Sequence, residues 1–325
     1  MSRIDASSPV LQVRDLSIEF PTQQRHVTVK AVNGVSFDVY AGETFGVIGE
    51  SGSGKTTLGR ALVSLIPPTR GELLQGGVQP SSLSKKALRE HRRDFQILFQ
   101  DPNAALNPRM RIVDSVMEPL EVAGHRDQQA NRAAALQAMA RVGLPTEFAE
   151  RYPHQLSGGQ KQRVIIARAL TLKPRLIVCD EVVAALDVSI RGEVLNLFAD
   201  LQREFGLTYV FITHDLSVVS HISDRIAVMY LGSLMELGPS QALSEAPLHP
   251  YTQALLSAEP IPIPRSMRDS QRIHLQGEVP SPMNPPSGCP FRTRCPKAIE
   301  ACAQSRPVLT EHVPGHWVAC HLAGH

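Results

Sequence analysis

The sequence has no apolar run long enough to cross a membrane. No stretch approaches the roughly 18 consecutive apolar residues that suggest a transmembrane helix. The first residues, Met1–Asp5, do not contain the apolar core of a secretory signal. We therefore expect a cytoplasmic protein.

Long runs of one charge are also missing. The chain of 325 residues has 33 basic and 31 acidic side chains, which gives a formal net charge of +2. This balance disfavours a protein that binds nucleic acid through a basic face. A hydrophobic content of 42% is ample for a packed core, and the length allows one large domain or two smaller ones.

Cysteine is almost absent before residue 289. The exception, Cys179, lies in an apolar stretch and is expected to be a small core residue. In a reducing compartment, a group of cysteines indicates a metal site rather than a set of disulfides. The other four cysteines form such a group near the C-terminal end: Cys289, Cys295, Cys302 and Cys320.

What the sequence does contain is a glycine-rich loop between a predicted strand, Glu43–Ile48, and a predicted helix, Thr57–Ile66. Glycines let successive backbone N–H groups turn inward, and the start of the helix adds a positive dipole end. The pattern predicts a nucleotide site in which Lys55 reaches the outer phosphates and the Thr56 hydroxyl binds Mg²⁺. The loop comprises Gly49, Glu50, Ser51, Gly52, Ser53, Gly54, Lys55, Thr56 and Thr57.

The remaining pattern predicts an α/β fold. Residues 10–47 alternate between apolar and polar side chains, which indicates antiparallel strands. The apolar runs Arg175–Asp180 and Leu207–Ile212 are typical of buried parallel strands, and residues 188–205 have a helical apolar face. Residues 108–156 read as an inserted helical lobe. Strands that alternate with helices indicate a parallel sheet.

A change in composition marks a domain boundary near residue 259. Eleven of the 25 prolines lie between Pro260 and the end of the chain, and Pro260–Pro264 reads as an extended linker. We expect a first domain over residues 1–258 and a second over residues 259–325.

Two carboxylates follow the strand Arg175–Asp180. Ligands bind at the carboxyl ends of parallel strands. Asp180 and Glu181 are therefore expected beside the glycine-rich loop Gly49–Thr57, which we call the phosphate loop. Asp180 would hold Mg²⁺, mostly through water. Glu181 would act as a general base that polarises the attacking water.

The segment Leu156–Gln160, with sequence Leu-Ser-Gly-Gly-Gln, gives the pattern its specificity. Ser157 is a good helix N-cap, and the two glycines allow a backbone to approach an anion closely. Together with the phosphate loop, Gln100 and His214, this segment resembles the signature of the ATP-binding cassette (ABC) family. The resemblance implies that four residues close over ATP held by the phosphate loop of a second subunit: Ser157, Gly158, Gly159 and Gln160.

The resemblance also implies an architecture and further site residues. The fold would be a P-loop NTPase of the ABC type, with a RecA-like parallel core, an antiparallel β subdomain, a helical subdomain at about 101–160, and a small Pro/Cys-rich C-terminal extension. Phe20 would stack on adenine, although a core Phe in the first strand fits the pattern too. Gln100 would contact Mg²⁺ and the attacking water. Asp187 would belong to the loop that crosses the dimer interface. His214, otherwise a capping or core histidine, would contact the γ-phosphate.

Two positions depart from the family pattern. Val182 follows the proposed base where Pro is common, and Ala184 occupies the position of a Ser. Because the carboxylates remain, we expect hydrolysis to persist with a changed rate or changed communication between the two sites.

Within the family, the chain is similar to the ATP-binding subunits of oligopeptide and dipeptide importers. The residues that carry this similarity are Phe99–Pro108, Arg151–Gln155, His249–Leu256, Cys289–Pro296, Cys302 and Val318–His321. The resemblance implies a second ATP-binding subunit, two membrane permease subunits and, indirectly, an extracytoplasmic solute-binding protein, with no nucleic acid. The chain would then act at the cytoplasmic face of the inner membrane. Nickel or another small solute, or a soluble ABC ATPase acting on nucleic acid or ribosomes, remain alternatives.

The same resemblance implies a [4Fe–4S] cluster on the four cysteines of the tail, which four thiolates can hold. Their spacing differs from that of common zinc sites and does not identify the metal by itself. Zn²⁺, held with the help of His316 or His321, and free thiols are the alternatives. The expected role is to staple a proline-rich tail with little core, while a redox or iron sensor that gates ATP turnover is the rival.

Overall fold

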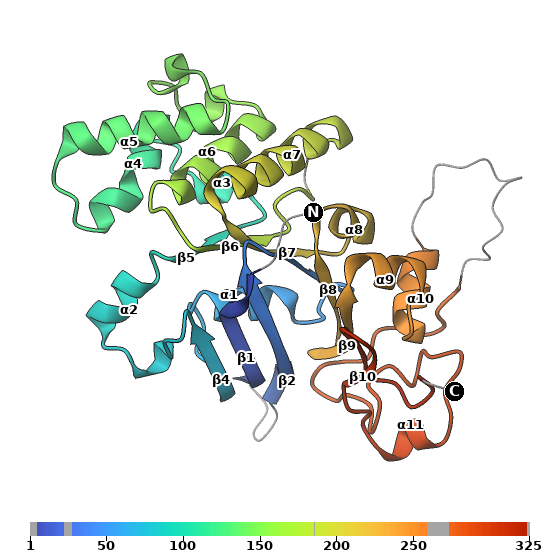
Figure 1. Ribbon diagram of the computed structural model, residues 1–325. Helices are drawn as coiled ribbons and strands as arrows, with labels where there is room; N and C mark the ends of the chain where they lie inside the picture. Colours follow the sequence, from blue (N-terminus) through green and yellow to red (C-terminus); the bar gives the residue numbers. More distant parts are fainter. Residues whose placement is uncertain (1–4, 23–27, 185, 259–272, 324–325) are drawn as a thin grey trace, which may run out of the picture.

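The computed structural model describes residues 5–22, 28–184, 186–258 and 273–323 (Figure 1). Their strands form a three-stranded sheet in the order β2-β1-β4 and an eight-stranded sheet in the order β10-β11-β9-β8-β3-β7-β6-β5. The predicted α/β class is therefore confirmed. No helix in the described ranges is long and apolar enough to span a membrane.

The three-stranded sheet is antiparallel, as the alternating pattern of residues 10–47 predicts. It consists of β1 (Asp5–Pro21), β2 (Thr28–Ala41) and β4 (Arg70–Gln75). The apolar side chains of one face are buried together with α1 and the main sheet, with Leu11, Val13 and Val35 fully buried. This sheet thus forms one wall beside the phosphate loop.

The main sheet is parallel through its centre. The parallel strands are β3 (Thr44–Ile48), β5 (Phe95–Leu98), β6 (Leu176–Asp180), β7 (Thr208–Thr213) and β8 (Arg225–Tyr230), and β9 (Ser233–Pro239) is antiparallel to β8. All five residues of β3 and of β6 are buried. Because parallel strands end at one edge, the residues after β3, β5, β6 and β7 gather there. The pattern analysis did not identify β8 and β9.

The helices lie on both sides of this sheet, and α4, α5 and α6 form a lobe at one end of it (Figure 1). The helices are α1 (Lys55–Leu62), α2 (Lys85–His91), α3 (Pro102–Ala105), α4 (Ile112–Val122), α5 (Gln128–Arg141), α6 (Gly158–Leu170), α7 (Val188–Phe205), α8 (Leu216–Ile222), α9 (Ser240–Glu245), α10 (Pro250–Ser257) and α11 (Ala301–Gln304). Helices α4 and α5 fall within the predicted helical insertion, and α7 has its predicted limits. Helix α1 begins two residues earlier than predicted and ends four residues earlier.

The described part of the tail continues the main sheet. Strands β10 (Thr310–Val313) and β11 (His316–Val318) form a hairpin, and β11 pairs with β9. A fully buried carboxylate, Glu236 in β9, accepts hydrogen bonds from the backbone N–H groups of Leu248 (2.7 Å) and His249 (3.0 Å), and it lies 2.7 Å from Nε2 of His316. The expected boundary near residue 259 and the linker Pro260–Pro264 lie outside the described residues.

A second buried carboxylate joins the two sheets. Glu43 has no solvent exposure, and its Oε1 and Oε2 accept hydrogen bonds from Nε (2.6 Å) and Nη2 (3.1 Å) of Arg225. Arg225 Nη2 also donates to the backbone carbonyl of Asp38, 2.6 Å away in β2. The pair therefore connects the start of β3 with β8 and β2.

We expect Glu43→Ala to lower the free energy of unfolding by about 3–5 kcal/mol, because it leaves the Arg225 guanidinium partly buried without its partner. The midpoint of urea unfolding measures this loss. As a control, Asp200→Ala removes the partner of Arg203 in an ion pair that is exposed on both sides, and it should cost less than about 1 kcal/mol. Equal losses in the two variants would contradict the assignment of Glu43.

Candidate functional site

The loop between β3 and α1 has a backbone that only glycine accommodates at two positions. A Cβ atom on Gly49 would lie 2.1 Å from the carbonyl oxygen of Met229, and one on Gly54 would lie 2.0 Å from that of Ala31. Gly54 also has a φ of 98°, in the region that side chains rarely adopt. The close approach of β2 and β8 therefore fixes the curl of the loop.

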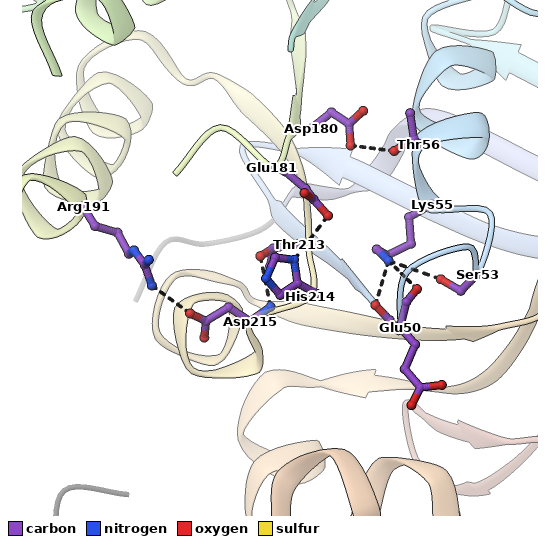
Figure 2. Close-up of polar contacts among 11 residues, drawn as sticks. Glu50, Ser53, Lys55, Thr56, Asp180, Glu181, Arg191, Thr213, His214 and Asp215 are labelled. Carbon is purple, nitrogen blue, oxygen red and sulfur yellow. Dashed lines mark hydrogen bonds and ion pairs between the residues drawn. The ribbon is translucent and has the colours of Figure 1, made fainter. Parts of the chain in front are cut away.

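Lys55 is buried inside this curl (Figure 2). Its ammonium donates hydrogen bonds to the carbonyls of Gly49 (2.7 Å) and Glu50 (2.9 Å) and to Oγ of Ser53 (3.3 Å). Burial lowers the pKa of Lys55, and neighbouring carboxylates act in the opposite direction. The loop thus holds a cation at its centre, where a phosphate group would be bound.

A cavity of about 210 Å³ lies over the loop. It is lined by residues 51–57 of the loop, residues 29–31 of β2, and Glu181. Phe20 in β1 pairs with Val29 in the antiparallel register, and its side chain is 39% exposed. Phe20 is therefore not a core residue, and it lies on the strand next to the one that lines the cavity.

The two predicted carboxylates lie at the end of β6, beside the loop. The Thr56 hydroxyl donates a hydrogen bond of 3.1 Å to Oδ1 of Asp180 (Figure 2). Burial raises the pKa of the Asp180 carboxyl group. Glu181 has a φ of 52°, an uncommon conformation for a residue with a side chain. Its N–H donates to the carbonyl of Ile212 (2.9 Å), and its Oε1 lies 3.3 Å from Nδ1 of His214.

Gln100 and Asp187, the other two predicted site residues, are both exposed. Gln100 follows β5 shortly after its last residue, and its side chain is exposed. Asp187 occupies the N-cap position of α7, but its side chain makes no capping hydrogen bond and is exposed. Neither side chain lines the cavity over the phosphate loop.

The signature residues form a rigid helix start at a separate place. Ser157 Oγ accepts the N–H of Gln160 (3.3 Å), and Gln160 Oε1 accepts the N–H of Ser157 (2.9 Å), which is a capping box. Ser157, Gly159 and Gln160 line a cavity of about 350 Å³ together with residues of α7. Gly158 is exposed at the same helix start. The fold therefore does not bring the signature to the phosphate loop of its own chain.

Val182 and Ala184, the two residues that depart from the family pattern, lie in a tight turn after Glu181. Val182 is buried, and Ala184 donates its N–H to the carbonyl of Glu181 (3.1 Å). A valine thus fills a buried position where the family commonly has proline.

Two residues far along the chain contact the phosphate loop and were not identified from the sequence. Tyr251 Oη accepts a hydrogen bond from the N–H of Glu50 (2.9 Å), and Arg294 forms an ion pair with the Glu50 carboxylate. They lie 201 and 244 residues away from Glu50. No spacing rule connects positions so distant, so the fold alone reveals these contacts.

The four tail cysteines are free thiols that lie near one another. Burial raises the pKa of Cys289 to about 11, and the charges of the other three thiols act in the same direction. Backbone N–H groups face three of the sulfurs, including that of Leu322 at 3.4 Å from Sγ of Cys320. Within the described ranges, no three His, Cys, Asp or Glu side chains are grouped closely enough to hold a single metal ion.

The two histidines that a zinc site could recruit are engaged elsewhere. Nε2 of His316 faces Glu236, and Nε2 of His321 lies 3.0 Å from the carbonyl of Ser305. Both Nε2 atoms thus have other partners, and Cys289, Cys295 and Cys302 pack in an apolar cluster that includes Phe291.

Solved structures of ATP-binding cassettes have a similar fold. The chain superimposes on a dimeric post-hydrolysis structure of the ATP-binding cassette MJ0796 bound to ADP and Pi, with a TM-score of 0.63 and 30% identity, over 71% of this chain and 98% of that one. A structure of cbiO1 from Clostridium perfringens, part of the transporter complex cbiONQ, gives a TM-score of 0.66 and 26% identity, over 74% of this chain and 93% of that one.

Sequence relatives extend over nearly the full length. The chain is 52% identical to the putative oligopeptide transport ATP-binding protein YkfD of Bacillus subtilis, over 97% of this chain and 95% of that protein. It is 51% identical to the oligopeptide transport ATP-binding protein AppF of the same organism, over 96% and 97%. It is 49% identical to OppF of Haemophilus influenzae, over 96% of each.

Two family descriptions match separate parts of the chain. Residues 32–184 match the ABC transporter family, and residues 235–302 match the C-terminal region of oligopeptide/dipeptide transporters. The chain therefore belongs to the ABC transporter family, among the ATP-binding proteins that carry the oligopeptide/dipeptide transporter C-terminal region.

Proposed function

We propose that this ABC ATPase is the ATP-hydrolysing subunit of a peptide importer. The observation that carries the proposal is the near-complete alignment with oligopeptide transport ATP-binding proteins, which includes the C-terminal region of that group. Import of nickel or another small solute through the same kind of machine is the alternative. The solute would be chosen by the permease subunits and by an extracytoplasmic solute-binding protein.

The residues at the carboxyl edge of the sheet would divide the chemistry among them. The backbone N–H groups of the loop and the Lys55 ammonium bind the outer phosphates of ATP. Glu181 accepts a proton from the attacking water, and His214, 3.3 Å from it, contacts the γ-phosphate. Phe20 supplies a face for the adenine ring.

The oxygen donors beside the loop suit Mg²⁺, which the ABC ATPase family requires. Thr56 and Asp180 present a hydroxyl and a buried carboxylate joined by a hydrogen bond of 3.1 Å. Gln100, which follows the neighbouring strand β5, would add an amide oxygen. When bound, the ion would neutralise phosphate charge. The chain's own contribution is to hold these oxygens at the edge of the sheet.

A second subunit would complete the site. Ser157, Gly158, Gly159 and Gln160 lie away from their own phosphate loop, so they are available to ATP held by a partner, and the exposed Asp187 would meet that partner as well. The partner is a second copy of this chain or a sister subunit. The turn at Val182 and Ala184 would alter the rate of hydrolysis or the communication between the two sites, while leaving the carboxylates in place.

The helical lobe offers a surface for the permease subunits. A cavity of about 630 Å³ lies between β5, α2 and α4, and three large apolar side chains at its border are exposed: Leu65 (45%), Phe99 (39%) and Val122 (56%). Arg89 and Arg93 donate hydrogen bonds to the carbonyls of Val122 and Ala123 at the end of α4, which fixes one wall of the cavity. We infer that a permease segment docks here, which would place the chain at the cytoplasmic face of the membrane.

The tail cysteines would hold a [4Fe–4S] cluster. A set of four sulfurs, three of which face backbone N–H groups, suits an iron–sulfur cluster, in which such hydrogen bonds adjust the redox potential. A cluster of four irons also separates its ligands more widely than a single zinc ion does. Its role would be structural, because the described tail has few core residues outside the cysteine region.

We expect Glu181→Gln to bind ATP, to lower kcat by about 10²- to 10⁴-fold because the general base is lost, and to accumulate as closed dimers. Phosphate release and size-exclusion chromatography with ATP measure the two effects. The exposed Glu204→Gln in α7 is the matched control and should hydrolyse ATP normally. Normal turnover in Glu181→Gln would refute the assignment.

We expect Val122→Asp to abolish co-purification with permease subunits from membranes, because a carboxylate cannot be buried in an apolar contact without cost. ATPase activity of the detached chain should persist. Val308→Asp, at a valine that is 75% exposed outside this cavity, should leave co-purification intact. Uptake of a labelled tripeptide and of Ni²⁺ by vesicles that contain the purified complex then distinguishes the two kinds of cargo.

We expect protein purified without oxygen to be brown and to contain iron and sulfide. Cys302→Ser should lose the colour and most of the iron, whereas Cys179→Ala, in the buried strand β6, should keep both. Absorbance spectra and metal analysis give the readout. Colourless protein with one zinc, or with no metal, would overturn the cluster.

A further inference from the structure

The phosphate loop carries one acidic side chain, Glu50, and the tail neutralises it. The Arg294 guanidinium forms two hydrogen bonds with the Glu50 carboxylate, Nη1 to Oε2 at 2.6 Å and Nη2 to Oε1 at 3.1 Å. The side chains are only 9% and 27% exposed. A paired geometry of this kind, largely shielded from water, is stronger than an ordinary surface ion pair.

Glu50 is held a second time through its backbone. Its N–H donates to Oη of the fully buried Tyr251, 2.9 Å away. The Tyr251 ring packs against Tyr230 and Phe291, with ring centroids 4.8 Å and 5.2 Å away. The Arg294 guanidinium lies over the ring of Tyr230, 5.9 Å from its centroid. An aromatic cluster thus fixes both groups that hold Glu50.

The carbonyl of the same residue faces the site. The Lys55 ammonium donates a hydrogen bond of 2.9 Å to the Glu50 carbonyl. Glu50 therefore links the tail on one side with the phosphate-binding cation on the other. Figure 2 shows the Glu50 carboxylate turned away from Asp180 and Glu181.

The charge of Glu50 reaches the centre of the loop. The carboxylate belongs to the residue whose carbonyl accepts the hydrogen bond of the Lys55 ammonium at 2.9 Å. Without a counter-charge, the same carboxylate would repel the phosphates of an ATP molecule bound in the loop.

We propose that Arg294 is a positioning residue for nucleotide binding, which neutralises Glu50 and holds the phosphate loop in its binding shape. The inference rests on the proposed function, because it concerns the affinity of that same site for ATP. It gives the C-terminal region a part in nucleotide binding, since Arg294 lies between Cys289 and Cys320 in the tail and immediately before Cys295.

The test is a double-mutant cycle on the full chain, with MgATP as the titrated ligand. Arg294→Gln should weaken MgATP binding about tenfold, which corresponds to about 1.4 kcal/mol, and should raise KM while kcat at saturating ATP stays within about twofold. In a Glu50→Gln background, Arg294→Gln should have little further effect, because the charge that it compensates is gone. Arg294→Lys should recover part of the affinity, since it keeps the charge without the fork.

Arg292→Gln is the matched control. Arg292 lies two residues earlier and donates its hydrogen bonds to Ser287 within the tail, so its loss should leave MgATP affinity unchanged. Normal affinity in Arg294→Gln, or an equal loss of affinity in the Glu50→Gln background, would overturn the role of Arg294. A wild-type chain that binds no MgATP would instead overturn the proposed function itself.

Discussion

The site depends on a buried cation. Placing an ammonium inside a protein is costly unless hydrogen bonds and opposite charges compensate for the lost water. Lys55 receives that compensation from the carbonyls of Gly49 and Glu50, from the Ser53 hydroxyl, and from the charge of nearby carboxylates. The loop places the carbonyls and the hydroxyl, whereas two of the carboxylates, Asp180 and Glu181, come from the end of β6. The loop has its curl because neighbouring strands leave no room for a side chain at Gly49 and Gly54.

The parallel sheet brings the other residues of the site to Lys55 from distant parts of the chain. Strands β3, β6 and β7 are neighbours and parallel, so their carboxyl ends deliver the loop, Glu181 and His214 to one edge. The contact between Glu181 and His214 across 3.3 Å is a direct result of that register. The strained backbone of Glu181 turns the chain sharply at the point where the β6 strand ends.

The sequence predicted those features of the site that depend on a few adjacent residues. The loop glycines, the capping box at Ser157 and Gln160, and the buried strand that ends at Asp180 are each defined by a few adjacent residues. The limits of α1 were less predictable, because the helix starts directly after Gly54, an N-cap with left-handed backbone, rather than where the apolar pattern begins. The pairing of Arg294 with Glu50 could not be predicted, because it depends on how the tail folds back onto β8 and α10.

The signature residues Ser157–Gln160 lie away from the phosphate loop of their own chain. Ser157 and Gln160 satisfy each other's backbone groups, which keeps the helix start rigid without any contact to the loop of the same chain. In the proposed dimer, a preformed surface of this kind would need little rearrangement to meet a nucleotide held by the partner. The chain would then present two half-sites whose internal hydrogen bonds are already formed.

The hairpin of β10 and β11 also has a bearing on solubility. Strand β9 is buried along almost its whole length, and on the side away from β8 its residues Glu236 and Leu237 pair with β11. Without the hairpin, an apolar strand would present unpaired N–H and C=O groups at the end of an eight-stranded sheet, a template for pairing with other chains. The new edge, β10, is short, and all four of its side chains are exposed, among them Glu311 and His312. The C-terminal region therefore replaces an aggregation-prone sheet edge with one whose side chains are mostly polar.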